Sequence, residues 1–149
     1  MTKKKVIIFG ASGFLGMKLA EFLKQKNYEV IMISRHQAEP KGLGKFCCWD
    51  AQNLGAWVEE MEGAEAIINL VGRSVDCVKS AENCDAILRS RVQSTTLISK
   101  ALKNLKELPK AWVQMSTAHI YGDSETNVCT EDSPYGYGLA PFVGQAWEK

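Results

Sequence analysis

The stretch that most constrains the fold is the glycine-rich turn Gly10-Ala11-Ser12-Gly13-Phe14-Leu15-Gly16. The apolar run Val6-Ile7-Ile8-Phe9 leads into this turn, and the amphipathic segment 17–23 follows it. Strand, glycine turn and helix in this order are typical of the first βα unit of a dinucleotide-binding fold. Gly10 permits a tight turn, Gly13 lets the backbone approach a pyrophosphate, and Gly16 lets the helix lie close to the strand. The helix N-terminus then offers free N–H groups to phosphates.

Composition excludes several classes of protein. The chain has 149 residues, of which 46% are hydrophobic and 23% charged, as expected of one globular domain with a core. A net charge of +1 gives no electrostatic reason to expect nucleic acid or an anionic membrane as partner. No apolar stretch approaches the ~20 residues of a membrane span. We therefore expect a cytoplasmic protein, with Lys3-Lys4-Lys5 as a solvated end before a buried strand.

The cysteines give no metal-binding pattern. Their number is odd, paired C-x-x-C spacing is absent, and only His36 and His119 could join them. We predict reduced thiols and no metal site; the cysteines are Cys47, Cys48, Cys77, Cys84 and Cys129.

Hydrophobic patterning predicts a doubly wound α/β fold. Five strand candidates alternate with helical patterns, which favours a Rossmann-like parallel sheet in the order 3-2-1-4-5 with helices on both faces. The expected strands are 5–9, 29–33, 46–49, 64–72 and 111–116, and the expected helices are 13–26, 51–61, 81–105 and 139–147. Residues 37–45 and 123–138 have loop composition.

Details of two helices are also predicted. The first helix places Phe14, Leu15, Leu19, Phe22 and Leu23 on one apolar stripe, and Asn27 is a candidate left-handed cap. The last helix can form if Pro141 lies in its first turn.

The end of the second strand bears on the type of cofactor. An acidic residue there normally accepts hydrogen bonds from the adenosine ribose of NAD, but this chain has Ser34-Arg35-His36. No carboxylate repels a 2′-phosphate, and Arg35 can pair with one. The pattern favours NADP over NAD; the alternative is a simply solvated Arg35.

Candidate site residues follow all the strands of the predicted sheet. Ligands of such sheets bind beyond the carboxyl ends of the strands, where the strand order reverses. The glycine turn, Ser34-Arg35, Asp50, Leu70-Val71-Gly72 and Ser116-Thr117 all come at such ends. We therefore expect them to converge on one cofactor site.

Taken together, these residues resemble the extended short-chain dehydrogenase/reductase superfamily. The G-x-x-G-x-x-G spacing, the Asn69-Leu70-Val71-Gly72 motif and the Ser116-Thr117-x-x-x-Tyr121-Gly122 motif fit its epimerase-like form. The chain is most similar to the "epimerase family" branch of NAD(P)-dependent epimerase/dehydratase-like proteins, which the remaining matches support: Trp49-Asp50, Ile87-x-x-Ser90-Arg91-Val92, Thr95-Thr96, Thr130-Glu131-Asp132-Ser133-Pro134 and Trp147-Glu148.

The resemblance implies a role for each motif. The turn, with Gly10, Ser12, Gly13, Phe14, Leu15 and Gly16, would hold the pyrophosphate. Ser34 and Arg35 would meet the adenosine ribose and its phosphate, and Asp50 would approach the adenine. The nicotinamide side would be lined by Leu70, Val71 and Gly72, and Thr117 matches the Ser/Thr that hydrogen-bonds a substrate oxygen.

Two departures from the superfamily pattern limit what the resemblance implies. The Tyr-x-x-x-Lys dyad is absent, because Leu139 and Val143 stand where its members belong. Extended members also continue into a substrate-binding domain, so residues 1–149 are interpreted as the NAD(P)-binding part alone. An open edge at the fifth strand would then offer a route to self-association.

Three functional hypotheses remain. The first is the NADP-binding domain of an epimerase/dehydratase-like oxidoreductase acting on an unknown small molecule, with its turnover put in question by the missing dyad. The second is a non-catalytic sensor or scaffold that uses bound cofactor to set its shape. The third is a structural Rossmann-like domain whose site stays empty.

Overall fold

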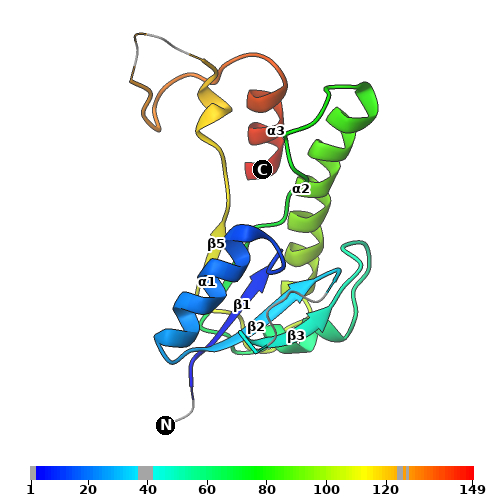
Figure 1. The fold of residues 1–149 in the computed structure, drawn as a ribbon, viewed down its shortest axis with the longest axis vertical. Coiled ribbons are helices and arrows are strands. Elements are labelled where there is room, and N and C mark those ends of the chain that lie inside the picture. The colour runs from blue at the N-terminus through cyan, green and yellow to red at the C-terminus, as the bar shows by residue number, and fades with distance from the viewer. Residues whose placement is uncertain (1–2, 37–41, 124–125, 127) are drawn as a thin grey trace. The chain divides into compact units, whose positions relative to one another are not determined.

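The computed structural model describes residues 3–36, 42–123, 126 and 128–149, so residues 37–41 of the expected loop at 37–45 lie outside the described part. Figure 1 shows the elements in chain order. They are β1 (Lys5–Phe9), α1 (Phe14–Gln25), β2 (Glu29–Ser34), β3 (Lys45–Cys48), η1 (Ala56–Met61), β4 (Ala66–Asn69), α2 (Ala81–Leu102), β5 (Trp112–Gln114), η2 (Ala118–Tyr121) and α3 (Leu139–Glu148), where η marks a 3₁₀-helix. No helix in this described part combines the length and apolar character that crossing a membrane requires.

The sheet has the predicted topology. Its strand order is β3-β2-β1-β4-β5, and the neighbouring strands run parallel. In the register of the three central strands, Ile7 lies beside both Ile31 and Ile67. The order reverses between β1 and β4, so the carboxyl ends of these strands mark the place where such folds bind ligands.

Alternating side chains of the central strands build a core on each face of the sheet. Ile7 and Phe9 point to the face covered by η1 and the C-terminal half of α2, whereas Ile8 points to the face covered by α1. All three side chains are fully buried. Burial on both faces explains why β1 reads as a continuous apolar run instead of an alternating one.

The buried face of α1 differs from the predicted stripe. Phe14, Leu15 and Phe22 are 74%, 55% and 52% exposed. The residues buried in α1 are Gly16 and Ala20, with Leu19 and Leu23 packed beside them. Small residues bring the helix axis close to β1, and this approach leaves the larger side chains of the predicted stripe outside the contact.

The ends of α1 and α3 follow the sequence signals. Asn27 adopts a left-handed conformation with φ 65°, and the Tyr28 N–H donates to Leu23 O beside it. Pro141 is the third residue of α3, where its missing N–H costs no helical hydrogen bond. Both predictions are confirmed.

The predicted helix at 51–61 is wrong in extent and type. Only Ala56–Met61 is helical, and it forms a 3₁₀-helix because residues 50–53 are taken up by a side-chain-stabilised turn at Asp50. The helix predicted at 81–105 ends at Leu102, where the chain turns through Asn104 N–H to Ala101 O.

The chain divides into two compact units. Unit 1 comprises Met1–Gly72 and Gln93–Met115, with the whole sheet, and unit 2 comprises Arg73–Val92 and Ser116–Lys149. In unit 2 the guanidinium of Arg91 lies 5.0 Å from the ring centre of Trp147 and donates to the carbonyl oxygens of Arg73 and Ile87 at 3.1 Å. Burial lowers the pKa of Arg91. This side chain therefore links three segments of unit 2.

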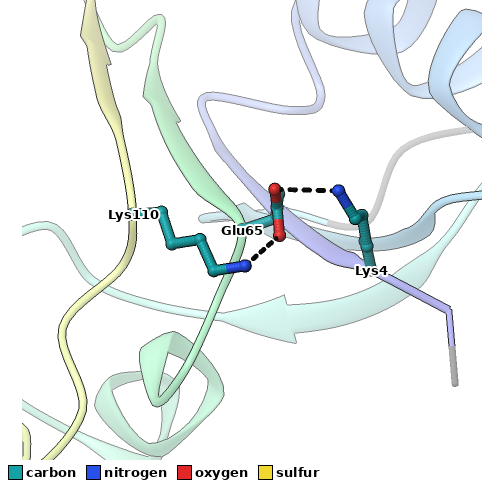
Figure 2. A network of polar contacts seen from close by, with 3 residues as sticks. All are labelled: Lys4, Glu65 and Lys110. Atoms are coloured by element: carbon teal, nitrogen blue, oxygen red, sulfur yellow. Dashed lines mark hydrogen bonds and ion pairs between the residues drawn. The ribbon is translucent and has the colours of Figure 1, made fainter.

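A charged network joins the amino ends of three strands in unit 1 (Figure 2). The Glu65 carboxylate accepts from Lys110 at 2.9 Å and from Lys4 at 3.1 Å. Both hydrogen bonds lower the pKa of Glu65, and the bond from Lys110 has the larger effect. Glu65 and Lys4 directly precede β4 and β1, and Lys110 lies two residues before β5. Because the lysines are exposed, the network helps to fix how these strands enter the sheet more than it adds to stability.

The close contact of α1 with β1 gives the first prediction. A Cβ on Gly16 would lie 2.6 Å from both Ala11 Cα and Gly10 O, which are backbone atoms that cannot turn aside. Helix propensity alone would make Gly16→Ala stabilising by about 1 kcal/mol. We expect the steric clash to outweigh the gain in helix propensity. Gly16→Ala should therefore lower the free energy of unfolding, measured in urea, by about 2 kcal/mol or more.

The exposed Gln25→Ala in the same helix serves as control and should change that free energy by less than about 0.5 kcal/mol. A Gly16→Ala protein as stable as the wild type would contradict the proposed close contact.

Candidate functional site

The N-terminus of α1 is open to an anion. Gly10 and Ala11 donate their N–H groups to Ile33 O at 2.9 and 3.3 Å, which ties the turn to the end of β2. Gly13 is the N-cap residue; no side chain caps the helix in the described structure, and its first turn carries no acidic residue. Among the described residues no side chain occupies the N–H groups of that turn, and the positive end of the helix dipole lies there, a combination typical of phosphate-binding helices.

Gly10 brings this turn against the exit of β4. Its φ of 78° lies in the region that favours glycine. A Cβ there would lie 3.1 Å from Leu70 C and O and from Val71 N, so β1 and β4 meet almost backbone to backbone. The turn and the Leu70-Val71 segment, which were predicted to share one site, are adjacent in the structure.

A buried amide shapes that exit. Asn69 is 1% exposed, and its Nδ2 donates to Thr95 Oγ1 at 3.2 Å and to Gln114 Oε1 at 3.1 Å. Its Oδ1 accepts from Val71 N at 3.1 Å. Asn69 thus joins β4 to α2 and β5 and fixes the backbone that faces Gly10. A buried amide with all these partners stabilises one arrangement of the loop.

An open cavity of about 510 Å³ lies beyond the ends of β2 and β3. Arg35 and His36 follow β2, Cys48 ends β3, and Asp50, Asn53 and Trp57 belong to the segment after β3. Arg35 and His36 are exposed, and so is Asp50. Predicted residues Arg35 and Asp50 therefore line the same cavity.

Ser34, the other predicted residue of this strand end, is 3% exposed. Its hydroxyl donates to His36 O at 2.7 Å and so holds the bend that carries Arg35. The predicted contact of Ser34 with a cofactor stays a prediction; the role visible in the structure is to shape the backbone.

Asp50 organises the turn after β3. Its Oδ1 accepts from the N–H groups of Gln52 and Asn53 at 2.8 Å, and its Oδ2 accepts from Asn53 Nδ2 at 2.7 Å. The side-chain bond from Asn53, followed by the two backbone bonds, lowers the pKa of Asp50 to about 2. The carboxylate therefore stays ionised at any ordinary pH.

Three packed aromatic rings form one wall of the cavity and the core behind it. The rings of Phe9, Trp49 and Trp57 meet pairwise, with centroids 5.0 to 5.6 Å apart. Trp49 and Trp57 are 5% and 2% exposed although both border the cavity. Such edge-to-face packing makes this wall rigid.

Unit 2 contains the predicted residue Thr117. Its Oγ1 accepts from His119 N at 3.2 Å and caps η2. Ser116, its neighbour, donates to the Glu148 carboxylate. Tyr121 is half-buried and stacks on Tyr135, with ring centroids 6.5 Å apart. Burial, aided by the nearby Glu131 and Glu148 carboxylates, raises the pKa of Tyr121.

The positions of the missing dyad lie on α3. Leu139 is its first residue and is half-buried, and Val143 is 5% exposed. Gly144 packs in the same unit against Ile120, where a Cβ would lie 3.0 Å from Ile120 Cγ1. These residues pack the interior of unit 2 and offer no acid or base.

Sequence reasoning missed Asn53, Asn69 and Trp57 as parts of the site. An aspartate followed three residues later by asparagine is a local turn signal that points to the Asp50–Asn53 pair. No such local signal marks Asn69, because its partners Thr95 and Gln114 are distant in the sequence.

The comparisons with known proteins agree with this architecture. The model of the NAD dependent epimerase/dehydratase family matches residues 6–142. The epimerase family protein YfhF of Bacillus subtilis is 30% identical over 97% of this chain and 48% of its own length. The human epimerase family protein SDR39U1 is 30% identical over 89% of this chain and 43% of its own length.

A solved structure also matches. The crystal structure of human SDR39U1 (isoform 2) with NADPH superposes with a TM-score of 0.78 at 27% identity, covering 97% of this chain and 47% of that one. The chain thus spans about half the length of the relatives that it matches. Because the family model covers residues 6–142 and the glycine turn, sheet order and strand-end motifs agree with it, the chain belongs to the NAD dependent epimerase/dehydratase family.

Proposed function

We propose that residues 1–149 form the NADP-binding part of an epimerase/dehydratase-like oxidoreductase. The observation that carries this proposal is the pairing, within unit 1, of an uncapped α1 N-terminus with a cavity whose rim bears Arg35. The carboxyl ends of β1, β2 and β3 adjoin in register, so both features belong to one edge of the sheet. When bound, NADP supplies hydride transfer; this chain's residues bind and orient it.

Each predicted residue has a place in this proposal. The glycine turn would let the pyrophosphate approach the start of α1 closely, because Gly10 and Gly16 keep the turn compact and no side chain of the described residues caps the helix. Leu70 and Val71, held by Asn69, would form the wall on the nicotinamide side. The residues proposed to contact the cofactor are Gly10, Ser12, Gly13, Phe14, Leu15, Gly16, Ser34, Arg35, Asp50, Leu70, Val71 and Gly72.

Two observations support NADP over NAD. The exposed Arg35 lies at the end of β2, where a carboxylate would otherwise select the unphosphorylated ribose. The human relative crystallised with NADPH fits the same preference.

Replacing Arg35 tests the proposed cofactor preference. We expect Arg35→Ala to weaken NADPH binding roughly 10- to 100-fold, because it removes a charge-assisted contact with the 2′-phosphate. NADH affinity should change less than threefold. Isothermal titration calorimetry of both cofactors against both proteins measures the effect.

Arg89→Ala is the matched control, since Arg89 is an exposed arginine of unit 2 that pairs with Asp85. If Arg35→Ala lost the same affinity for NADPH as for NADH, Arg35 would be a solvated side chain that does not contact the 2′-phosphate. No binding of either cofactor to the wild type at millimolar concentration would refute the proposed function.

The proposed catalytic residue, Thr117, lies in unit 2. Thr117 would donate a hydrogen bond from its hydroxyl to a substrate carbonyl or hydroxyl, since within the described residues its oxygen acts as the acceptor for His119 N. The substrate is a small molecule of unknown identity. The absence of a Tyr-x-x-x-Lys pair favours the second candidate function, a cofactor-dependent sensor or scaffold.

Turnover distinguishes the two candidates. An oxidoreductase should oxidise NADPH with at least one member of a panel of aldehydes, ketones and nucleotide-sugar ketones, followed by absorbance at 340 nm. Thr117→Val should then lower kcat roughly 100-fold or more while NADPH affinity is retained.

The control for this measurement is Thr130→Val, because Thr130 is another threonine of unit 2 and is exposed. Three residues of the same loop, Ser124, Glu125 and Asn127, lie outside the described residues. Tight NADPH binding without turnover on any member of the panel would favour the sensor.

We further propose that the chain self-associates through β5. This strand pairs only with β4 in the described sheet. Ala111 O and Met115 N bond to β4, and the alternation of a parallel ladder directs the backbone groups of Trp112 and Gln114 to the outer edge. Val113 is 52% exposed. An edge of this kind can pair with a second copy.

A charge on this strand should prevent pairing. We expect Val113→Lys to be monomeric at 100 μM, at which concentration the wild type should sediment as a dimer in analytical ultracentrifugation. Val128→Lys, at a fully exposed valine of unit 2, is the control and should remain dimeric. A monomeric wild type would refute the self-association.

A cytoplasmic location is proposed as well. Each of the five cysteines, all of them among the described residues, is a free thiol, which fits a reducing compartment.

A further inference from the structure

The cavity beside Arg35 has an acceptor that the sequence motifs do not explain. Asp50 spends its carboxylate on three hydrogen bonds within the 50–53 turn. Asn53, which also lines the cavity, donates one of these bonds through Nδ2. Its Oδ1 accepts no hydrogen bond from the described part of the chain.

The structure fixes the orientation of this amide. An ionised carboxylate can only accept hydrogen bonds, so the Asn53 group that faces Asp50 Oδ2 at 2.7 Å must be the NH₂. The low pKa of Asp50 keeps the carboxylate ionised. The amide oxygen therefore points away from Asp50 and has no competing donor there.

Asn53 is held at three points. Its N–H donates to Asp50 Oδ1 at 2.8 Å, its Nδ2 donates to Asp50 Oδ2, and its carbonyl oxygen accepts from Trp57 Nε1 at 3.2 Å. Trp57 is 2% exposed and packs edge-on against Phe9 and Trp49. An acceptor fixed in this way loses little conformational entropy when a ligand binds.

The chemistry of this acceptor selects one kind of base. Adenine carries an exocyclic NH₂ donor at C6, whereas hypoxanthine carries a carbonyl oxygen at the same position. A fixed carbonyl oxygen accepts from the first and repels the second. The apolar surface of Leu54 and Trp57 beside it suits the flat face of a base.

We propose that Asn53 Oδ1 accepts the hydrogen bond from the adenine 6-amino group and thereby makes Asn53 the base-specificity residue of the cavity. This inference rests on the proposed function, since it assumes that the cavity holds the adenosine end of NADP. It adds Asn53 to Asp50 as a residue that meets the base, and it gives Asp50 the further role of positioning Asn53.

The test compares NADPH with reduced nicotinamide hypoxanthine dinucleotide phosphate, which differs from it at C6 and N1 of the base. Calorimetry on the wild type should show roughly tenfold weaker binding of the hypoxanthine form. In Asn53→Ala the two affinities should agree within twofold, because the discriminating oxygen is gone. Gln52→Ala, a neighbour in the same turn that does not line the cavity, should keep the wild-type ratio.

Separate readouts distinguish loss of base reading from collapse of the turn. The preference of Asn53→Ala for NADPH over NADH, which depends on Arg35, should survive unchanged. If alanine abolishes that preference, Asn53→Ser, which keeps a turn-forming side chain, replaces it and should give the same equal affinities for both bases.

A wild type that binds NADPH but does not discriminate the bases overturns this inference and leaves the proposed function standing. So does an Asn53 variant that keeps the NADPH-over-NADH preference together with the wild-type base ratio. A wild type that binds neither cofactor at millimolar concentration refutes the proposed function itself.

Discussion

The backbone contact around Gly10 and Gly16 is the constraint on which the rest of unit 1 depends. Gly16 lets α1 lie on β1 at a separation that any Cβ would prevent, and Gly10 lets the same turn touch the exit of β4. The core residues Ile7, Ile8 and Phe9 then sit between two covered faces. The same contact places the uncapped first turn of α1 at the carboxyl end of β1, so the packing and the proposed anion site share one piece of backbone.

Two polar side chains fix the backbone of the segments that follow β4 and β3. Asn69, fully buried, fixes the Val71 backbone opposite Gly10 and ties it to Thr95 and Gln114. Asp50, exposed, fixes a turn that bears Asn53 and closes over Trp57. The difference in burial matters: removing Asn69 would delete hydrogen bonds inside unit 1, to the half-buried Thr95 and Gln114, whereas removing Asp50 would release a surface turn to water.

The two units differ in the chemical groups that they provide. Unit 1 provides a helix terminus, a basic strand end and a rigid aromatic wall, all of which suit a dinucleotide. Unit 2 provides Thr117, but its helix α3 presents Leu139 and Val143 in place of an acid and its activator. The chain spans about half the length of these relatives.

The sequence by itself determined the order of strands and helices, the glycine turn, the left-handed cap at Asn27 and the strand ends that carry the candidate site residues, because each depends on local periodicity or on one residue's conformational range. Tertiary structure alone decided the rest. Phe14, Leu15 and Phe22 are exposed because Gly16 and Ala20 make the contact with the sheet, which hydrophobicity along the chain does not reveal. Asn69 gained its role from partners 26 and 45 residues away. The expected helix at 51–61 yielded to the Asp50 turn, since a carboxylate that binds nearby N–H groups competes with helix formation.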